Sequence, residues 1–383
     1  MRKREYDFWL LFAVLALMSI GMVMIFSASS YYASYYLNNK FHFLIRQMLW
    51  GGVGLVCMFV ASKIDYRRLA VLSPIFMLVS IVLLILVAIP GIGAKYNDAR
   101  RWFNLGFTTF QPSELMKLSI IMFLSFSLSK NSDKLRFFFK GLVPYLLIVG
   151  FVDLLLLLEP HYSCAVLITL VACVILFCAG ARIFHFLCIG VPGLAIAAYL
   201  VVSSPYRWKR FTSFLDPFAD PQGSGYQAVN SLYAIASGSI FGRGLGKSLQ
   251  KYLYIPEPQN DFIFSIVAEE LGFVGAFTVI VLFLLLIWRG VRISMNAPDM
   301  VGSLMAIGIT SLVAIETIIN IAVVTATIPV TGMPLPFISY GGTSLLFLLT
   351  GMGILLNISR NSASSFTPVR GTELIRRARQ GAD

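Results

Sequence analysis

Asp261 stands where a polar stretch of the chain meets a new apolar run, and a carboxylate in that position can act as a general base. The polar stretch extends from Tyr226 to Gly272. Apolar residues that follow, beginning at Phe262, would withdraw the carboxylate from water and raise its pKa, whereas a helix dipole and nearby bases would lower it. A carboxylate between those effects is suited to accept a proton. The alternative is that Asp261 caps the N-terminus of the next helix, because aspartate accepts hydrogen bonds from free amides there.

Basic residues gather in the same part of the chain. Arg210, Arg243 and Lys247 precede the carboxylate, and the last two are set among the glycines of Gly238–Ser248. Glycines let backbone amides come close to a ligand and the bases supply positive charge, so this loop can hold an anion. Its end is similar to a nucleotide-binding loop, but Phe241 stands where that motif requires glycine. A flexible loop without a ligand is the alternative, and no nucleotide site is predicted.

Ionisable residues also occur inside runs that are otherwise apolar, where they are costly and become functional candidates. Glu114 and Lys117 are three residues apart and share one helix face. If the runs that contain Lys117 and Asp153 form an antiparallel hairpin, these two residues lie at the same depth. We therefore predict a buried Lys117–Asp153 ion pair, with Glu114 about 4.5 Å nearer the outside. Such a pair either serves the site or only fixes the helix packing. Further candidates of this kind are Glu159, Glu269, Glu270 and Glu316.

The composition indicates a membrane protein that crosses the bilayer many times. Of its 383 residues, 58% are hydrophobic and only 13% are charged. The net charge of +12 is then typical of cytoplasmic loops and lipid headgroups, not of nucleic-acid binding. The five cysteines stand in apolar runs and the three histidines are scattered, so neither a disulfide framework nor a histidine metal site is predicted.

Ten apolar runs are long enough to cross a membrane as helices, which predicts an all-α polytopic fold. The runs are 8–29, 44–61, 70–89, 113–129, 141–158, 163–180, 184–203, 262–287, 299–326 and 343–358. With the N-terminus inside, more than half of the lysines and arginines fall on the cytoplasmic side. We expect one transmembrane domain over residues 1–358 and a basic cytoplasmic tail, disordered, over 359–383. A long outer loop, 204–261, joins the seventh and eighth helices and carries the site.

The last outer connection, Thr331–Thr343, contains two prolines and three glycines and cannot form a straight helix. Irregular backbone at membrane depth is tolerated where protein or water covers it. We expect a re-entrant segment that lines the site and brings Ser339 to it. An ordinary loop followed by a helix that starts at Thr343 is the alternative.

From about Tyr6 to Asn357 the chain resembles the SEDS family of cell-wall polymerases, which comprises the FtsW, RodA and SpoVE proteins. The stretches that carry the resemblance are Arg101-Trp102 with Phe110–Lys117, Tyr226-Gln227 with Ser231–Gly238, Pro256–Phe264 with Ala268–Gly272, and Pro334–Gly342. The triplet Ser231–Tyr233 is more similar to the division or sporulation branch than to the elongation branch. Glu159–Cys164 departs from the usual Gln-Pro-Asp-Leu-Gly-Thr, so no role is carried over to an aspartate there.

The resemblance implies a peptidoglycan glycosyltransferase that polymerises lipid II on the outer face of the cytoplasmic membrane. It implies that Asp261 is the catalytic base, that the anomeric carbon is inverted and that undecaprenyl pyrophosphate leaves. Candidate substrate-binding residues are Arg101, Glu114, Lys117, Arg210, Arg243, Lys247 and Ser339. The family suggests that Mg²⁺ or Mn²⁺ assists, although no ligand cluster in the sequence requires a metal. The implied partners are a class B penicillin-binding transpeptidase and other divisome proteins at the septum, with both termini cytoplasmic.

Two other functions fit part of the same evidence. Ten spans, charges inside the membrane and a broken segment are also typical of a transporter, including a flippase for lipid II. A carrier would place its key charges near the midplane, whereas Asp261 lies at the outer boundary, which favours the polymerase. A scaffold for division proteins would not need Asp261, although a polymerase can serve as a scaffold as well.

Overall fold

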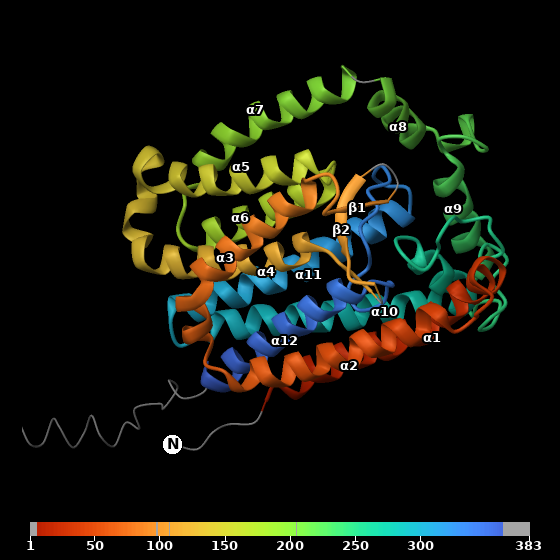
Figure 1. Ribbon diagram of the computed structural model, residues 1–383, viewed down its shortest axis with the longest axis horizontal. Helices are drawn as coiled ribbons and strands as arrows, with labels where there is room; N and C mark the ends of the chain where they lie inside the picture. Colours follow the sequence, from red (N-terminus) through yellow and green to blue (C-terminus); the bar gives the residue numbers. More distant parts are fainter. Residues whose placement is uncertain (1–5, 97–98, 107, 204, 363–383) are drawn as a thin grey trace, which may run out of the picture.

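A bundle of long helices makes up most of the computed structural model, which describes residues 6–96, 99–106, 108–203 and 205–362 (Figure 1). The long helices are α1 (Phe8–Leu37), α2 (His42–Lys63), α3 (Tyr66–Ala88), α4 (Pro112–Asn131), α5 (Val143–Leu158), α6 (Tyr162–Cys178), α7 (Ile183–Val202), α10 (Ile263–Met295), α11 (Met300–Val324) and α12 (Gly342–Ser362). By length and composition, seven stretches of the described chain can cross a membrane: α1, α2, α3, α10, α11, most of α12, and α5 with the turn before it. The polytopic class is thus supported, and the ten-span topology stays a prediction.

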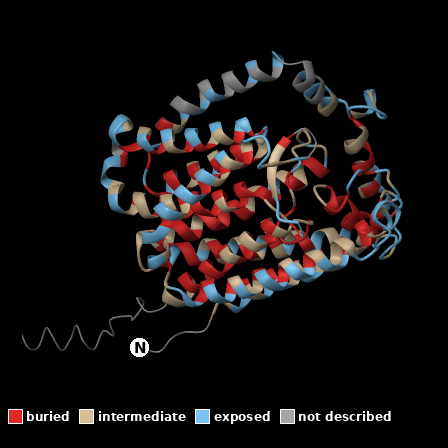
Figure 2. Cartoon of the chain, in the orientation of Figure 1, coloured by how far each residue is buried: buried red, intermediate tan, exposed pale blue. Residues whose placement is uncertain are grey.

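The centre of the bundle is built from α4, α11 and α12, whose residues are mostly buried (Figure 2). Around them α2 packs on α12, α3 on α4, and both α1 and α11 on α10. The outer helices leave large apolar side chains exposed, such as Val71, Ile75 and Leu78 on α3. An apolar outer surface of this kind matches hydrocarbon instead of water.

A small antiparallel sheet lies between α3 and α4 and was not expected from the sequence. Its strands β1 (Ala94–Tyr96), β2 (Ala99–Asn104) and β3 (Thr109–Phe110) pair in chain order. The indole nitrogen of Trp50 on α2 donates to the Thr108 hydroxyl at 3.0 Å. This contact ties the sheet to the same end of the bundle at which α4 begins.

The loop over 204–261 contains two short helices, α8 (Pro205–Leu215) and α9 (Tyr226–Gly238), and a 3-10 turn at Pro217–Ala219 (Figure 1). The composition of Gln227–Ser237, which contains alanines, predicts a short helix within this loop, and α9 confirms it. After α9 the chain has no helix until α10, and it returns to pack against the start of α10.

The first two turns of α10 are set off from the rest by Gly272, whose φ is +68° and ψ −166°. Phe273 and Val274 donate their amides to the carbonyls of Ser239 and Ile240, at 2.9 and 3.1 Å. A side chain at position 272 would overlap the backbone of Ile240 and Gly242. The kink therefore joins the end of α9 to the membrane part of α10.

We expect Gly272→Ala to cost about 1–3 kcal/mol of stability, because alanine is strained at positive φ and its methyl group meets backbone. The measurement is the thermal unfolding midpoint in detergent. Gly52→Ala is the matched control, since that helical glycine has open space around it. Equal midpoints for the two variants would show that the kink does not require glycine.

The predicted ion pair between Lys117 and Asp153 is wrong. The main neighbours of α4 are α3, α11 and α6, whereas α5 packs mainly on α6. The connection between α4 and α5, Ser132–Leu142, forms a 3-10 turn and a π-helical turn that carry α5 away from α4. Asp153 instead accepts a hydrogen bond from the Thr169 hydroxyl of α6 at 2.6 Å. Equal depth was therefore not enough to bring the two residues together.

Candidate functional site

Asp261 lies just before α10 and does not cap it. The helix begins at Ile263, and the residue at its N-cap position is Phe262, which makes no side-chain cap. Removal from water raises the pKa of the half-buried Asp261 carboxyl to about 6. The negative charge of Glu257 raises this pKa further, and a backbone hydrogen bond opposes the shift. The carboxyl group is thus available for chemistry near neutral pH.

The backbone at Asp261 is held by Asn320, a fully buried residue of α11. Its side-chain amide nitrogen donates to the Asp261 carbonyl at 2.8 Å and to the Met333 carbonyl at 2.7 Å. The Tyr340 amide donates to the Gln259 carbonyl at 2.8 Å. These contacts join the loop that carries Asp261 to the segment that follows α11. Sequence reasoning missed Asn320, although a polar residue four positions after Glu316 in an apolar run is a usable signal.

The segment from Thr331 to Tyr340 is non-helical and largely buried by protein, as its prolines and glycines predicted. The Ser339 hydroxyl is buried and accepts the Leu335 amide at 2.8 Å. Gln47 of α2 contacts the Ser339 carbonyl and the Gly341 amide, both at 3.2 Å. Ser339 therefore shapes this turn, whereas Gly332 is the residue that lies against the Asp261 carboxylate.

Lys117 makes two buried ion pairs, one along its own helix and one across to α11. Its ammonium is 2.7 Å from the Glu114 carboxylate and 2.6 Å from the Glu316 carboxylate. All three residues are buried, and one oxygen of Glu316 has no hydrogen-bond partner. Glu316 and Asn320 share a face of α11, so this cluster lies one helical turn from the residue that holds Asp261.

Arg101 of β2 forms hydrogen bonds to the turn between α5 and α6. Its guanidinium donates to the Glu159 carbonyl at 3.0 Å and also to the Pro160 carbonyl. Burial raises the pKa of the Glu159 carboxyl to about 8, against the opposing charge of Arg101, and neither carboxyl oxygen has a partner. Burial also lowers the pKa of His161 to about 3. The Ser163 hydroxyl, which donates to the Thr331 carbonyl at 2.6 Å, links this corner to the segment beside Asp261.

Glu269 and Glu270 hold in place the glycine loop, which is the glycine-containing loop after α9 and before Asp261. The Glu270 carboxylate accepts the Gly246 and Ser248 amides at 2.9 and 3.2 Å and pairs with Lys251 at 3.2 Å. The Glu269 carboxylate accepts the Leu249 amide at 2.9 Å and the Ser248 hydroxyl. The amides expected to hold an anion therefore already hold a carboxylate of the same chain.

The side chains of Arg243 and Lys247 are exposed on that loop. Arg210 falls in α8, but its side chain lies outside the described part of the chain. Among the described residues, no group of three or more His, Cys, Asp or Glu side chains forms a metal site. A divalent ion near Asp261 would take most of its ligands from water, as Mg²⁺ commonly does.

The structure thus divides the predicted site residues into separate groups. Asp261 is near Asn320 and Gly332. The cluster of Glu114, Lys117 and Glu316 lies one helical turn from Asn320. Arg101 binds the turn between α5 and α6. Arg243 and Lys247 are exposed on the loop between α9 and α10. Each of the three groups that contain Asn320, Glu316 and Glu159 has a buried polar atom without a hydrogen-bond partner on that residue.

Comparison with known proteins places these features in a family. A model of FtsW/RodA/SpoVE proteins, described as cell cycle proteins, matches residues 8–364. Stage V sporulation protein E of Bacillus subtilis (strain 168) is 46% identical over 94% of this chain and 99% of its own length. The probable peptidoglycan glycosyltransferase FtsW of Trichlorobacter lovleyi is 43% identical over 94% of each chain.

Solved structures give the same result for the fold. A chain from a peptidoglycan synthase complex that coordinates polymerization and crosslinking is 32% identical, with a TM-score of 0.77 over 93% of this chain and 98% of that one. The crystal structure of the rod shape determining protein RodA of Thermus thermophilus is 29% identical, with a TM-score of 0.68 over 93% of this chain and 97% of that one.

Proposed function

The chain belongs to the FtsW/RodA/SpoVE family of cell cycle proteins, and we propose that it is a peptidoglycan glycosyltransferase. Its substrate in this proposal is lipid II, a disaccharide-peptide on undecaprenyl pyrophosphate, and its product is a growing glycan strand. Relatives described as probable peptidoglycan glycosyltransferases support this reaction class. We infer that the reaction serves cell division or sporulation, because stage V sporulation protein E and FtsW are 46% and 43% identical to this chain, whereas RodA is 29% identical.

The observation that carries the proposal is the state of Asp261. It is a half-buried carboxyl group with a pKa of about 6, it does not cap a helix, and its backbone is fixed by Asn320. A general base is most effective when its pKa lies near the working pH and when its position is held by its surroundings. Asp261 meets both conditions.

In the proposed reaction Asp261 accepts the proton of the acceptor sugar's 4-hydroxyl group. The hydroxyl oxygen attacks the anomeric carbon of the donor sugar, the new glycosidic bond inverts that carbon, and the bond to the lipid pyrophosphate breaks. The pyrophosphate leaves with the bonding electrons and requires positive charge. We assign this positive charge to Arg243 and Lys247, which are both exposed on the loop before Asp261. A divalent ion, Mg²⁺ or Mn²⁺, would supply further positive charge to the leaving pyrophosphate when bound.

We infer ten membrane spans, with both termini in the cytoplasm and Asp261 at the outer face. The long helices fill the ten apolar runs, and more than half of the basic residues would then be cytoplasmic. We also propose a class B penicillin-binding transpeptidase as partner at the septum. The similar chain from a peptidoglycan synthase complex, in which polymerization and crosslinking are coordinated, supports this pairing.

The function is tested by supplying purified lipid II to the purified protein, alone and with the transpeptidase partner. We expect long glycan strands, with more product when the partner is present. No strands under either condition, together with movement of lipid II across vesicle membranes, would favour the transporter instead.

The pKa of Asp261 also predicts how the rate depends on pH. The base must be unprotonated, and with a pKa of about 6 its unprotonated fraction rises about tenfold between pH 5 and pH 7. We expect the rate of strand synthesis to rise by about the same factor over this interval. An ordinary exposed aspartate would already be unprotonated at pH 5, so a flat profile would contradict the assignment. The unfolding midpoint at each pH shows that the protein stays folded.

A further inference from the structure

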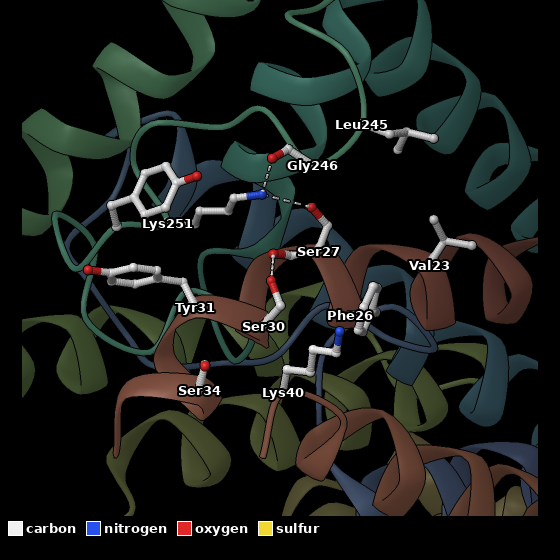
Figure 3. Close-up of a pocket in the computed structure, with 11 residues that line it drawn as sticks. Val23, Phe26, Ser27, Ser30, Tyr31, Ser34, Lys40, Leu245, Gly246 and Lys251 are labelled. Atoms are coloured by element: carbon white, nitrogen blue, oxygen red, sulfur yellow. Dashed lines mark hydrogen bonds between the residues drawn. The ribbon is translucent and has the colours of Figure 1, made fainter. Parts of the chain in front are cut away.

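A cavity of about 520 Å³ opens between α1, the turn that precedes α2 and the loop from Leu245 to Tyr252 (Figure 3). It belongs to the end of the bundle that carries the glycine loop, but the residues that line it do not include Asp261 or its neighbours. The proposed glycosyl transfer gives this cavity no role.

The wall of the cavity changes from apolar to polar along α1. Val23 and Phe26 lie at one end, with Leu245 facing them across the opening, whereas Ser30 and Ser34 lie towards the other end (Figure 3). The side chain of Lys40 extends from below α1 towards Phe26. Val23 is near the middle of α1, and Ser34 is about 16 Å further along, near its end. This gradient follows the depth of a bilayer, from hydrocarbon to headgroup.

The charge in the cavity comes from Lys40. Lys251 is buried and its ammonium is already shared by Glu270 at 3.2 Å, the Gly246 carbonyl at 2.5 Å and the Ser27 hydroxyl at 3.4 Å. Lys40 is exposed, lies 5.1 Å from the centroid of the Phe41 ring, and takes part in no ion pair among the described residues. One uncompensated cation therefore lies beside Phe26, between the apolar end of the cavity and the end lined by Ser30 and Ser34.

We propose that this cavity binds an anionic phospholipid. Its phosphate contacts Lys40, the Ser34 hydroxyl donates to the headgroup, and one acyl chain lies along Val23 and Phe26. The Ser30 hydroxyl takes no part, because it already donates to the Ser27 carbonyl at 3.2 Å. Cationic side chains at the membrane surface attract anionic headgroups, and apolar side chains below them hold the chain. Since the loop from Leu245 to Tyr252 forms the opposite wall, the lipid also stabilises the loop that Glu269 and Glu270 hold.

The test is native mass spectrometry of the detergent-purified protein titrated with phosphatidylglycerol. We expect Lys40→Gln to weaken the first lipid-binding step about fivefold, because one cation–phosphate contact is lost. Lys63→Gln is the matched control, since it removes the same charge from the other end of α2, where Lys63 also lies over a phenylalanine ring. It is expected to leave the first step unchanged. Equal affinities for wild type and Lys40→Gln would overturn the proposal.

Two further ligands distinguish the source of the phosphate. Diacylglycerol, which lacks it, should bind wild type and Lys40→Gln equally. If Lys40→Gln weakens the binding of undecaprenyl phosphate but not the binding of phosphatidylglycerol, the site binds the polyprenyl carrier. The assignment to a bilayer lipid is then wrong. Neither readout requires glycosyl transfer, so the result is independent of the proposed function.

Discussion

Asp261→Asn is expected to lower the rate of glycan strand synthesis by about 10²–10⁴-fold while the protein remains folded. Asparagine has nearly the same shape as aspartate but cannot accept the proton of the attacking hydroxyl. The side chain of Asp261 does not cap α10, and the contact with Asn320 uses the backbone carbonyl, so the variant keeps both features. The measurement is the initial rate of strand formation from lipid II in the presence of the transpeptidase partner.

Asp216→Asn is the matched control for this experiment. Asp216 lies in the same loop between α7 and α10, is exposed, and caps the turn at Pro217–Ala219 by accepting the Phe218 amide at 3.2 Å. Asparagine is an equally good cap, so this variant should retain the wild-type rate. If both variants retain it, Asp261 has no part in proton transfer and the base lies elsewhere.

Lys117→Met is expected to cost about 3–5 kcal/mol of stability, the largest such effect that we predict. The lysine ammonium stands between the carboxylates of Glu114 and Glu316, and all three side chains are buried. Its removal leaves two negative groups close together without a counterion. These groups must then bind protons or draw in water, and both responses disturb the packing of α4 on α11. Unfolding in detergent, followed by heating or by denaturant, measures the loss.

Two further variants show whether the loss arises from the charges. Lys130→Met, near the end of the same helix, removes an exposed lysine that only covers the Phe126 ring, and it should change stability by less than about 0.5 kcal/mol. Replacing Glu114 and Glu316 by glutamine in the Lys117→Met background should recover part of the loss, because the uncompensated charges are gone. No recovery would mean that packing, not charge, sets the cost.

Local features of the fold could be predicted from the sequence because they depend on near neighbours. Apolar runs of sufficient length gave the positions of the long helices, and prolines and glycines predicted the non-helical segment after α11. The short helix α9 was predicted from its composition. Glu114 and Lys117, three residues apart, were expected on one face and do form an ion pair.

Contacts between distant segments could not be predicted in the same way. Depth along a helix does not say which helices are neighbours, so Lys117 was paired with Asp153 when its partner across the bundle is Glu316. The glycine loop has the amides of an anion site, but only the fold reveals that Glu270, 24 residues after Gly246, occupies them. The role of Asn320 depends on Asp261 and Met333 meeting it from two separate loops.

The most direct test of the central claim uses proteoliposomes that contain lipid II, the transpeptidase partner and either wild type or Asp261→Asn. Strand length and movement of lipid II between leaflets are measured in the same sample. We predict that wild type makes long strands, that Asp261→Asn makes almost none, and that movement of lipid II is the same with both. Equal polymerisation by the two proteins, or movement of lipid II without polymerisation by either, would contradict the assignment of Asp261 as the base of a peptidoglycan polymerase.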